Sequence, residues 1–148
     1  MSVADLEGAA GVSSVRVRVR YAETDQMGVA HHSHYLVWCE AARTEHMRHL
    51  GASYRDMEQH GLRLPVVDAR VRYRTAARYD DPLEVYCWVR EIASRLVAFG
   101  YALVSADERR LVATAQTTLM AVDSAHGRTV IPPEIRERLA PIADPIRL

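Results

Sequence analysis

The residues best suited to chemistry lie in one short segment at positions 21–35, which reads Tyr-Ala-Glu-Thr-Asp-Gln-Met-Gly-Val-Ala-His-His-Ser-His-Tyr. Asp25 supplies a carboxylate that can act as a nucleophile or as a general base. Gly28 permits the close or left-handed turn of a tight loop. A helix is expected to begin near His32 and Ser33, and the first amides of a helix have no intrahelical acceptor. A carboxylate beside free backbone donors suits acyl transfer, because the donors can stabilise an oxyanion.

Two other interpretations apply to the same segment. An Asp before a helix often serves only as a cap or a turn residue. The histidines at 31, 32 and 34 suggest a metal site, but these spacings rarely converge on one ion, and no distant carboxylate or cysteine pattern supports them. We therefore expect no metal and no organic cofactor. Glu40 and Arg43 lie three residues apart on the helix and are expected to pair, although Glu40 could instead hold the loop.

Hydrophobic periodicity predicts the elements that must position this segment. We expect strands at 15–21, 64–73, 83–91, 96–105 and 111–122, a long helix at 33–50, a short helix at 53–61 capped by Ser53, and a C-terminal helix from Pro132. The first half of the long helix is apolar on nearly every side, which predicts that it is buried. Its second half turns polar from Arg43, so we expect this end, with His46 and His49, to be exposed.

One long helix and five strands, four of them consecutive, predict an α+β fold with a mostly antiparallel sheet. A single helix covers only one face of such a sheet. The uncovered face and the sheet edges therefore favour a symmetric oligomer. Residues 1–12 are expected to form a flexible tail, and residues 13–148 a single domain.

Composition excludes several classes of protein. Nineteen basic side chains balance nineteen acidic ones, which disfavours a nucleic-acid binder. Every basic residue is Arg, so a Schiff-base or phosphate-loop lysine is excluded. We find no secretory signal and no apolar run that could span a membrane. Cys39 and Cys87 are too few for a disulfide scaffold and are expected as buried thiols in a reducing cytoplasm. Gly-x-Ser-x-Gly, Gly-rich dinucleotide and His-Glu-x-x-His motifs are absent.

Three motifs together resemble a known family. They are D-Q-M-G-V-A-H-H-S-H-Y at 25–35, E-A-A-R at 40–43 and Y-D-D-P-L-E-V at 79–85. This pattern resembles the hot-dog-fold acyl-CoA thioesterases, and more closely the 4-hydroxybenzoyl-CoA thioesterase branch that includes the Tol–Pal-associated bacterial enzymes. The resemblance covers about residues 15–122. It implies a sheet wrapped around one central helix, and a cytoplasmic homodimer or homotetramer that hydrolyses an acyl-CoA to a free acid and CoA.

The resemblance also implies roles for particular residues. The family's catalytic carboxylate falls on Asp25, its helix-start backbone donor falls on His32, and Gly28 belongs to the same catalytic loop. Relatives often have Tyr at the position of His31 and Asn or Ser at that of His34, so both departures are expected to alter the acyl pocket. The residues expected to contact the substrate are His31, His34, Tyr35, Val67 and Arg95.

Arg95 has a separate expected role. It lies in the turn between the strands at 83–91 and 96–105, and it matches a basic position that relatives place against the CoA phosphates. Arg suits this role because its planar fork donates two hydrogen bonds at once. Arg95 could equally be a solvated turn residue.

Two further functions remain open from the sequence. The acyl group could be carried by acyl carrier protein, which a basic patch near the tunnel mouth would favour. The chain could also be a non-catalytic acyl-CoA-binding module, although such a binder needs no carboxylate at Asp25 beside an anionic ligand. A hot-dog hydratase is disfavoured, because its usual Asn partner is missing from a chain without Asn.

Overall fold

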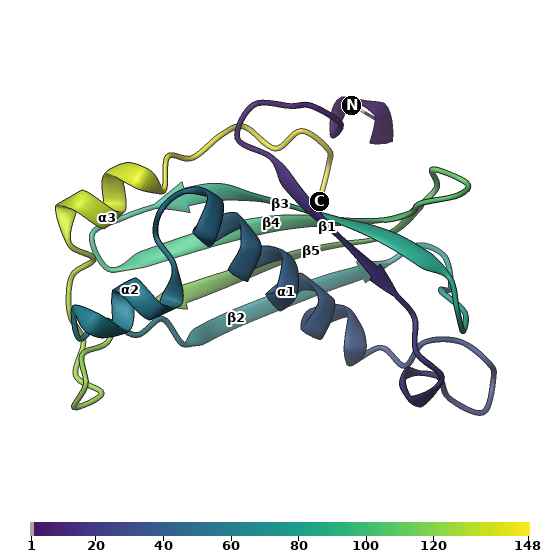
Figure 1. The fold of residues 1–148 in the computed structure, drawn as a ribbon, viewed down its shortest axis with the longest axis horizontal. Helices are drawn as coiled ribbons and strands as arrows, with labels where there is room; N and C mark the ends of the chain where they lie inside the picture. Colours follow the sequence, from purple (N-terminus) through teal and green to yellow (C-terminus); the bar gives the residue numbers. More distant parts are fainter. Residues whose placement is uncertain (1) are drawn as a thin grey trace.

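One five-stranded sheet, with a long helix packed against it, organises the computed structural model, which describes residues 2–148 (Figure 1). The strand order is β1-β3-β4-β5-β2, and every neighbouring pair is antiparallel. The strands are β1 (Ser13–Arg18), β2 (Val66–Tyr73), β3 (Pro82–Ile92), β4 (Leu96–Ser105) and β5 (Leu111–Met120). The helices are η1 (Val3–Asp5), η2 (Tyr21–Glu23), α1 (His34–His49), α2 (Tyr54–Gln59) and α3 (Pro133–Arg138). The predicted α+β hot-dog fold is confirmed.

The inner core lies between α1 and the sheet. Tyr35, Trp38 and Met47 of α1 pack in one hydrophobic cluster with the inward-facing side chains of β3, β4 and β5. Cys39 and Cys87 belong to this cluster, and both are 0% exposed and unbridged. The expectation of two buried free thiols is therefore confirmed. Within residues 2–148, no helix is long and apolar enough to cross a membrane.

The exposure of α1 differs from the prediction. Its first half is not buried all round, because the sheet covers only one side and Val37 remains 54% exposed. Its second half emerges only in part, because Arg43 and His46 are buried, whereas Arg48 and His49 are exposed as predicted. Arg43 does not pair with Glu40. Its guanidinium donates to the hydroxyls of Tyr54 and Tyr101, at 2.8 and 3.1 Å.

The outer face of the sheet is covered by both ends of the chain. Leu6 and Ile146 are buried in a second cluster with Tyr86 and Trp88 of β3 and with Ala102 and Val104 of β4. The Asp144 carboxylate accepts hydrogen bonds from Trp88 Nε1 and from the Arg90 guanidinium. The N-terminal segment, expected to be a flexible tail, thus contributes Leu6 to a packed layer. The two terminal segments lie near each other along one side of the sheet (Figure 1).

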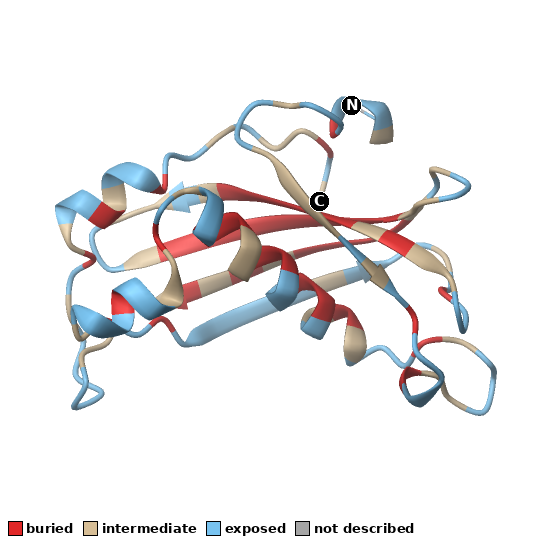
Figure 2. Cartoon of the chain, viewed as in Figure 1, coloured by how far each residue is buried: buried red, intermediate tan, exposed pale blue. Residues whose placement is uncertain are grey.

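β2 is an edge strand with little cover. Its residues are exposed along nearly its whole length, and only Val71 is half-buried (Figure 2). The alternation at 67–73 predicts a strand with one buried face; the strand is present, but Val71 is its only residue that is not exposed. Val66 and Val67 remain 46% and 55% exposed, and the pairing register shifts at this point. An exposed apolar edge can accept another strand.

Candidate active site

The loop between η2 and α1 is closed on itself. Thr24 and Ala30 form an antiparallel bridge, and the Asp25 N–H donates to the Val29 carbonyl at 2.9 Å. Gly28 has φ +79° and donates its N–H to the Asp25 carbonyl at 3.0 Å. This left-handed conformation is one that glycine adopts at no steric cost. The loop therefore presents Asp25 in a defined backbone geometry.

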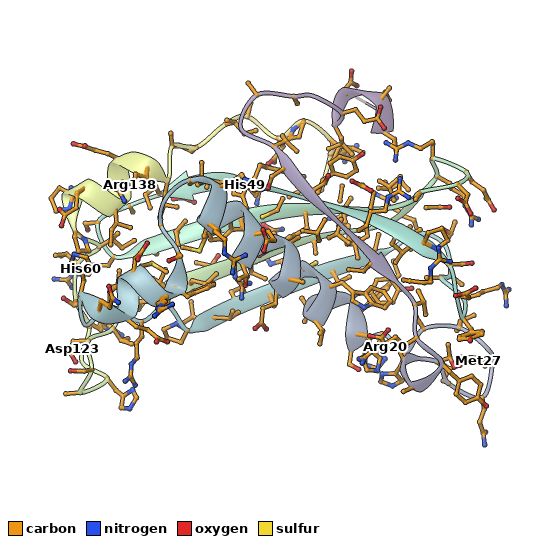
Figure 3. The ribbon with its side chains drawn as sticks, viewed as in Figure 1. Arg20, Met27, His49, His60, Asp123 and Arg138 are labelled. Carbon is orange, nitrogen blue, oxygen red and sulfur yellow. The ribbon has the colours of Figure 1, made fainter. Side chains whose placement is uncertain are left out.

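The Asp25 carboxylate is half-buried and only partly engaged. Its Oδ1 accepts the Met27 N–H at 2.8 Å, which is the local turn that the cap interpretation predicts. Its Oδ2 accepts no hydrogen bond from any residue in the described chain, 2–148. One carboxylate oxygen is thus held in place while the other is available for chemistry. Figure 3 labels Met27 at the far end of the molecule, beyond the first turn of α1.

Among the three backbone N–H groups of residues 31–33, just before α1, one is a free donor. The His31 N–H donates to the Glu23 carbonyl at 2.8 Å, and the His34 N–H donates to the His31 carbonyl at 3.1 Å. The Ser33 N–H, expected to be free, points at His31 Nδ1 at 3.3 Å. Among residues 2–148, no group accepts the His32 N–H. This donor sits at the positive end of the α1 dipole and can bind a carbonyl oxygen or an oxyanion.

The His32 peptide is held from its other side. The Tyr73 hydroxyl, from the end of β2, donates to the His32 carbonyl at 2.9 Å. Tyr73 also packs edge-on against Tyr35, with ring centroids 5.0 Å apart. Tyr35 is buried, and its hydroxyl accepts the Ala77 N–H at 3.4 Å. Burial raises the pKa of Tyr35. Tyr35 therefore supports the site as a wall and keeps its proton at neutral pH.

The three histidines form a cluster of rings. The rings of His31 and His32 lie 4.1 Å apart, those of His31 and His34 lie 6.3 Å apart, and His31 Nδ1 is 2.9 Å from the Ser33 hydroxyl. In the part of the chain that the structure describes, no three His, Cys, Asp or Glu side chains form a group that could hold a metal ion. The three rings therefore lie on the same short segment as the free His32 N–H.

Glu23 is a site residue that the sequence did not single out. It is 2% exposed, and its carboxylate accepts hydrogen bonds from the Arg20 N–H at 2.8 Å and from Trp38 Nε1 at 3.0 Å. The Arg20 guanidinium lies 3.4 Å away, and His34 Nδ1 lies 3.9 Å away. Burial favours a higher pKa for Glu23. The hydrogen bonds from Arg20 and Trp38 and the positive charge of Arg20 outweigh this effect, so the pKa of Glu23 lies below its ordinary value. Figure 3 shows Arg20 beside the start of α1.

Val67 and Arg95 lie away from Asp25 in the described chain. Arg95 is exposed in the turn after β3, whereas Asp25 lies beside the segment before β3, where Ala30 N–H bonds the Ala77 carbonyl. The 11 residues of β3 separate these ends by about 35 Å. The structure thus brings together Asp25, Gly28, His31, His32, His34 and Tyr35, but not Val67 or Arg95.

Comparison with known proteins identifies the class to which this fold and loop belong. Residues 19–139 match the thioesterase-like superfamily. This match covers most of the chain, so the chain belongs to that superfamily.

Individual relatives support the same class. The putative acyl-CoA thioesterase YneP of Bacillus subtilis is 41% identical over 90 residues, which are 61% of this chain and 65% of YneP. A putative esterase of Aquifex aeolicus is 33% identical over 84% of this chain and 94% of its own. The solved DHNA-CoA thioesterase of Staphylococcus aureus has a TM-score of 0.81 at 30% identity, covering 86% of this chain and 87% of its own. The solved hypothetical protein TT1821 of Thermus thermophilus has a TM-score of 0.80 at 37% identity, covering 86% and 95%.

Proposed function

We propose that the protein hydrolyses an acyl-CoA thioester to a free acid and CoA. The observation that carries this proposal is the unpaired His32 N–H at the start of α1, on the same closed loop as the free oxygen of Asp25. The names of the relatives support the same reaction. YneP is named a putative acyl-CoA thioesterase, and YbgC of Escherichia coli, 33% identical over 72% of this chain and 79% of its own, is named an acyl-CoA thioester hydrolase.

The proposed reaction begins when the thioester carbonyl oxygen accepts the His32 N–H. Negative charge grows on that oxygen as the carbonyl carbon is attacked, and the His32 N–H with the α1 dipole stabilises it. In one route Asp25 attacks directly, CoA leaves as the thiolate, and water then hydrolyses the anhydride. In the other route Asp25 takes a proton from the attacking water. Both routes consume one water and yield one acid and one thiol, and Gly28 holds the loop for both.

The decisive test is Asp25→Asn, measured as thiol release over a panel of aliphatic and aromatic acyl-CoAs. The variant keeps the size of the side chain and the Oδ1 acceptor for Met27 but removes the nucleophile and base. We expect turnover to fall by at least about 100-fold, the scale of one acid–base contribution. The melting temperature should stay near that of the native protein. Near-normal turnover in this variant would refute the role of Asp25.

A second copy of the chain is proposed to complete the site. When two β2 strands pair antiparallel about a two-fold axis, the Val66 end of one lies beside the Tyr73 end of the other. At one end of β2, Tyr73 contacts His32. At the other end, the Pro65 carbonyl accepts the Met120 N–H and the Arg95 carbonyl accepts the Ala121 N–H, so the Arg95 turn lies near the start of β2. Such a homodimer carries the partner's Val67 and Arg95 toward the Asp25 loop. This arrangement would bring all the predicted site residues to one place.

Arg95 is proposed to hold the CoA nucleotide in that dimer. Its guanidinium has no ion pair with any described residue, and the contact would be exposed, so it is worth roughly 1 kcal/mol. Arg95→Ala should therefore raise KM by about 5-fold and leave kcat nearly unchanged. The effect should vanish for a short pantetheine thioester that lacks the nucleotide. An equal rise in KM on both substrates would exclude a nucleotide contact.

The substrate panel also separates the finer alternatives. The motifs at 25–35 and 79–85 favour the 4-hydroxybenzoyl-CoA thioesterase branch with its Tol–Pal-associated members, and this predicts activity on aromatic or short acyl-CoAs. Faster turnover of acyl groups on acyl carrier protein would instead indicate the carrier-protein thioesterases. Binding of acyl-CoA without any thiol release would indicate a non-catalytic module. The rings of His31 and His34 are proposed to form part of the acyl pocket.

A further inference from the structure

Glu23 connects the candidate loop to the helix through two different parts of the residue. Its carboxylate accepts the Trp38 indole N–H, one turn inside α1, at 3.0 Å. Its backbone carbonyl accepts the His31 N–H at 2.8 Å, and the neighbouring Thr24–Ala30 bridge continues that pairing. Glu23 therefore ties both ends of the 24–30 loop to the beginning of α1.

The two groups proposed for chemistry follow directly from these anchor points. Asp25 lies two residues after Glu23, and His32 lies one residue after His31. The separation of the carboxylate and the free N–H is thus set by bonds that Glu23 makes. A displacement of about 1 Å in such a site can cost about 100-fold in rate. Small changes in how Glu23 is held should therefore appear in catalysis.

The charge of Glu23 matters as well as its shape. A carboxylate only accepts hydrogen bonds, so it can take the Arg20 N–H on Oε1 and the Trp38 N–H on Oε2 at once. Glutamine has the same length but offers one acceptor oxygen and one NH₂ group. One of these two donors would then face an NH₂ and lose its partner. The Arg20 guanidinium would also lose its ionic partner at 3.4 Å.

We propose that Glu23 is a positioning residue that holds the Asp25 carboxylate and the His32 N–H in register for one thioester carbonyl. Glu23 is buried beneath the loop and acts through the His31–His32 backbone. This inference rests on the proposed hydrolase function for its kinetic readout, and it has a second readout that does not.

The kinetic test compares Glu23→Gln with the native protein on one acyl-CoA. We expect kcat to fall by at least about 10-fold while KM changes by less than about 2-fold, because the lost alignment affects the transition state and not ground-state binding. Trp38→Phe removes only one donor and leaves the charge, so it should lower kcat by a smaller factor. Since both changes break one contact, their effects in the double variant should be less than additive.

The second readout is hydrogen exchange of the backbone amides at 24–33. In Glu23→Gln we expect the hydrogen-bonded amides of this segment, such as those of Asp25, Ala30 and His31, to exchange at least about 10-fold faster, because the loop loses its anchor on α1. The amides of β3 and β4 should keep their protection. Trp38→Phe gives the same readout if Glu23→Gln does not fold.

Glu84→Gln is the matched control. Glu84 is also a part-buried, ion-paired carboxylate, bonded to Ser14 Oγ at 2.6 Å and Arg16 Nε at 2.7 Å, but it lies on β3 away from the loop. It should change neither kcat nor exchange at 24–33. Native-like kcat and exchange in Glu23→Gln would overturn the inference. If the native protein releases no thiol from any acyl-CoA, the proposed function fails, and the exchange result alone decides the role of Glu23.

Discussion

At the scale of single residues, His46 occupies a place where charge is costly. It is 3% exposed, and its Nδ1 lies 2.6 Å from the Ser13 hydroxyl. Burial, with a smaller contribution from His49, lowers the pKa of His46 to about 4. The neutral ring is therefore part of the folded core, and a proton added to it opposes folding.

This burial predicts a pH dependence of stability. The unfolded chain protonates His46 near its ordinary pKa of about 6.5, whereas the native protein resists protonation down to about 4. Between these values the unfolded state binds more protons, so stability falls as pH drops from 6.5 toward 4, by up to about 3 kcal/mol. The contribution is fully present above pH 6.5. Urea unfolding at several pH values in this window measures it.

His46→Gln provides the reference for that measurement. The variant cannot titrate, so its stability should depend less on pH between 6.5 and 5 than that of the native protein. Carboxylates such as Glu23 and Asp144, whose pKa values are lowered, weaken the fold at lower pH in both proteins. Parallel curves for the two proteins would show that His46 is accessible to protons in the folded state.

At the scale of elements, local patterns predicted almost every helix and strand. Period-two alternation located β1 and β2, and runs of residues between turns located β3, β4 and β5. Gly51, with φ +73°, follows α1 as the expected stop signal. The sequence could not predict which way an individual side chain on a helix faces. Whether Arg43 faces solvent or two phenols depends on Tyr54 and Tyr101, which lie 11 and 58 residues further along the chain.

The site was predictable to the same extent. The motif located Asp25, Gly28 and the backbone donor of His32, because these features are local in sequence. The sequence did not predict Glu23 as a site residue, because a Glu in a polar loop is usually solvated. Its burial depends on contact with Trp38, which donates to the Glu23 carboxylate from 15 residues further along the chain. A Trp on the buried face of the following helix was the only signal present.

Gly100 on β4 tests the packing between strands. A Cβ at this position would lie 2.5 Å from the Trp88 ring of neighbouring β3, and Trp88 is fully buried. Gly100→Ala should therefore force the indole to shift and lower the free energy of unfolding by about 1–3 kcal/mol, measured in urea. Gly127→Ala, in an exposed turn whose nearest contact is the Asp123 side chain at 3.1 Å, should cost less. Equal effects would mean that the Trp88 layer adapts freely.

At the scale of the whole molecule, the outer face of the sheet is covered, whereas the sheet edge at β2 is not. The outer face of the sheet is closed by Leu6, Ile146 and the Asp144–Arg90 ion pair. The edge at β2 is open, with Val66, Val67 and Tyr73 exposed along it. We therefore propose that a second chain associates at the β2 edge and not at the covered face.

Light scattering tests whether the chains associate through the β2 edge. The native protein should have the mass of a dimer or a larger assembly. The double variant Val66→Asp with Val67→Asp should be a folded monomer without thioesterase activity, because both side chains are already exposed and the charges oppose strand pairing. A monomer that turns over acyl-CoA would exclude the shared site.

The sealed thiols of the inner core have a practical consequence. Disulfide reagents react with thiolates, and burial raises the pKa of both Cys39 and Cys87 while hiding their sulfur atoms. A colorimetric reagent added to the folded protein will therefore count only the CoA that is set free. When the same reagent is mixed with the protein in the absence of substrate, its absorbance will rise at the rate at which unfolding exposes Cys39 and Cys87. These two cysteines therefore report unfolding without an added label.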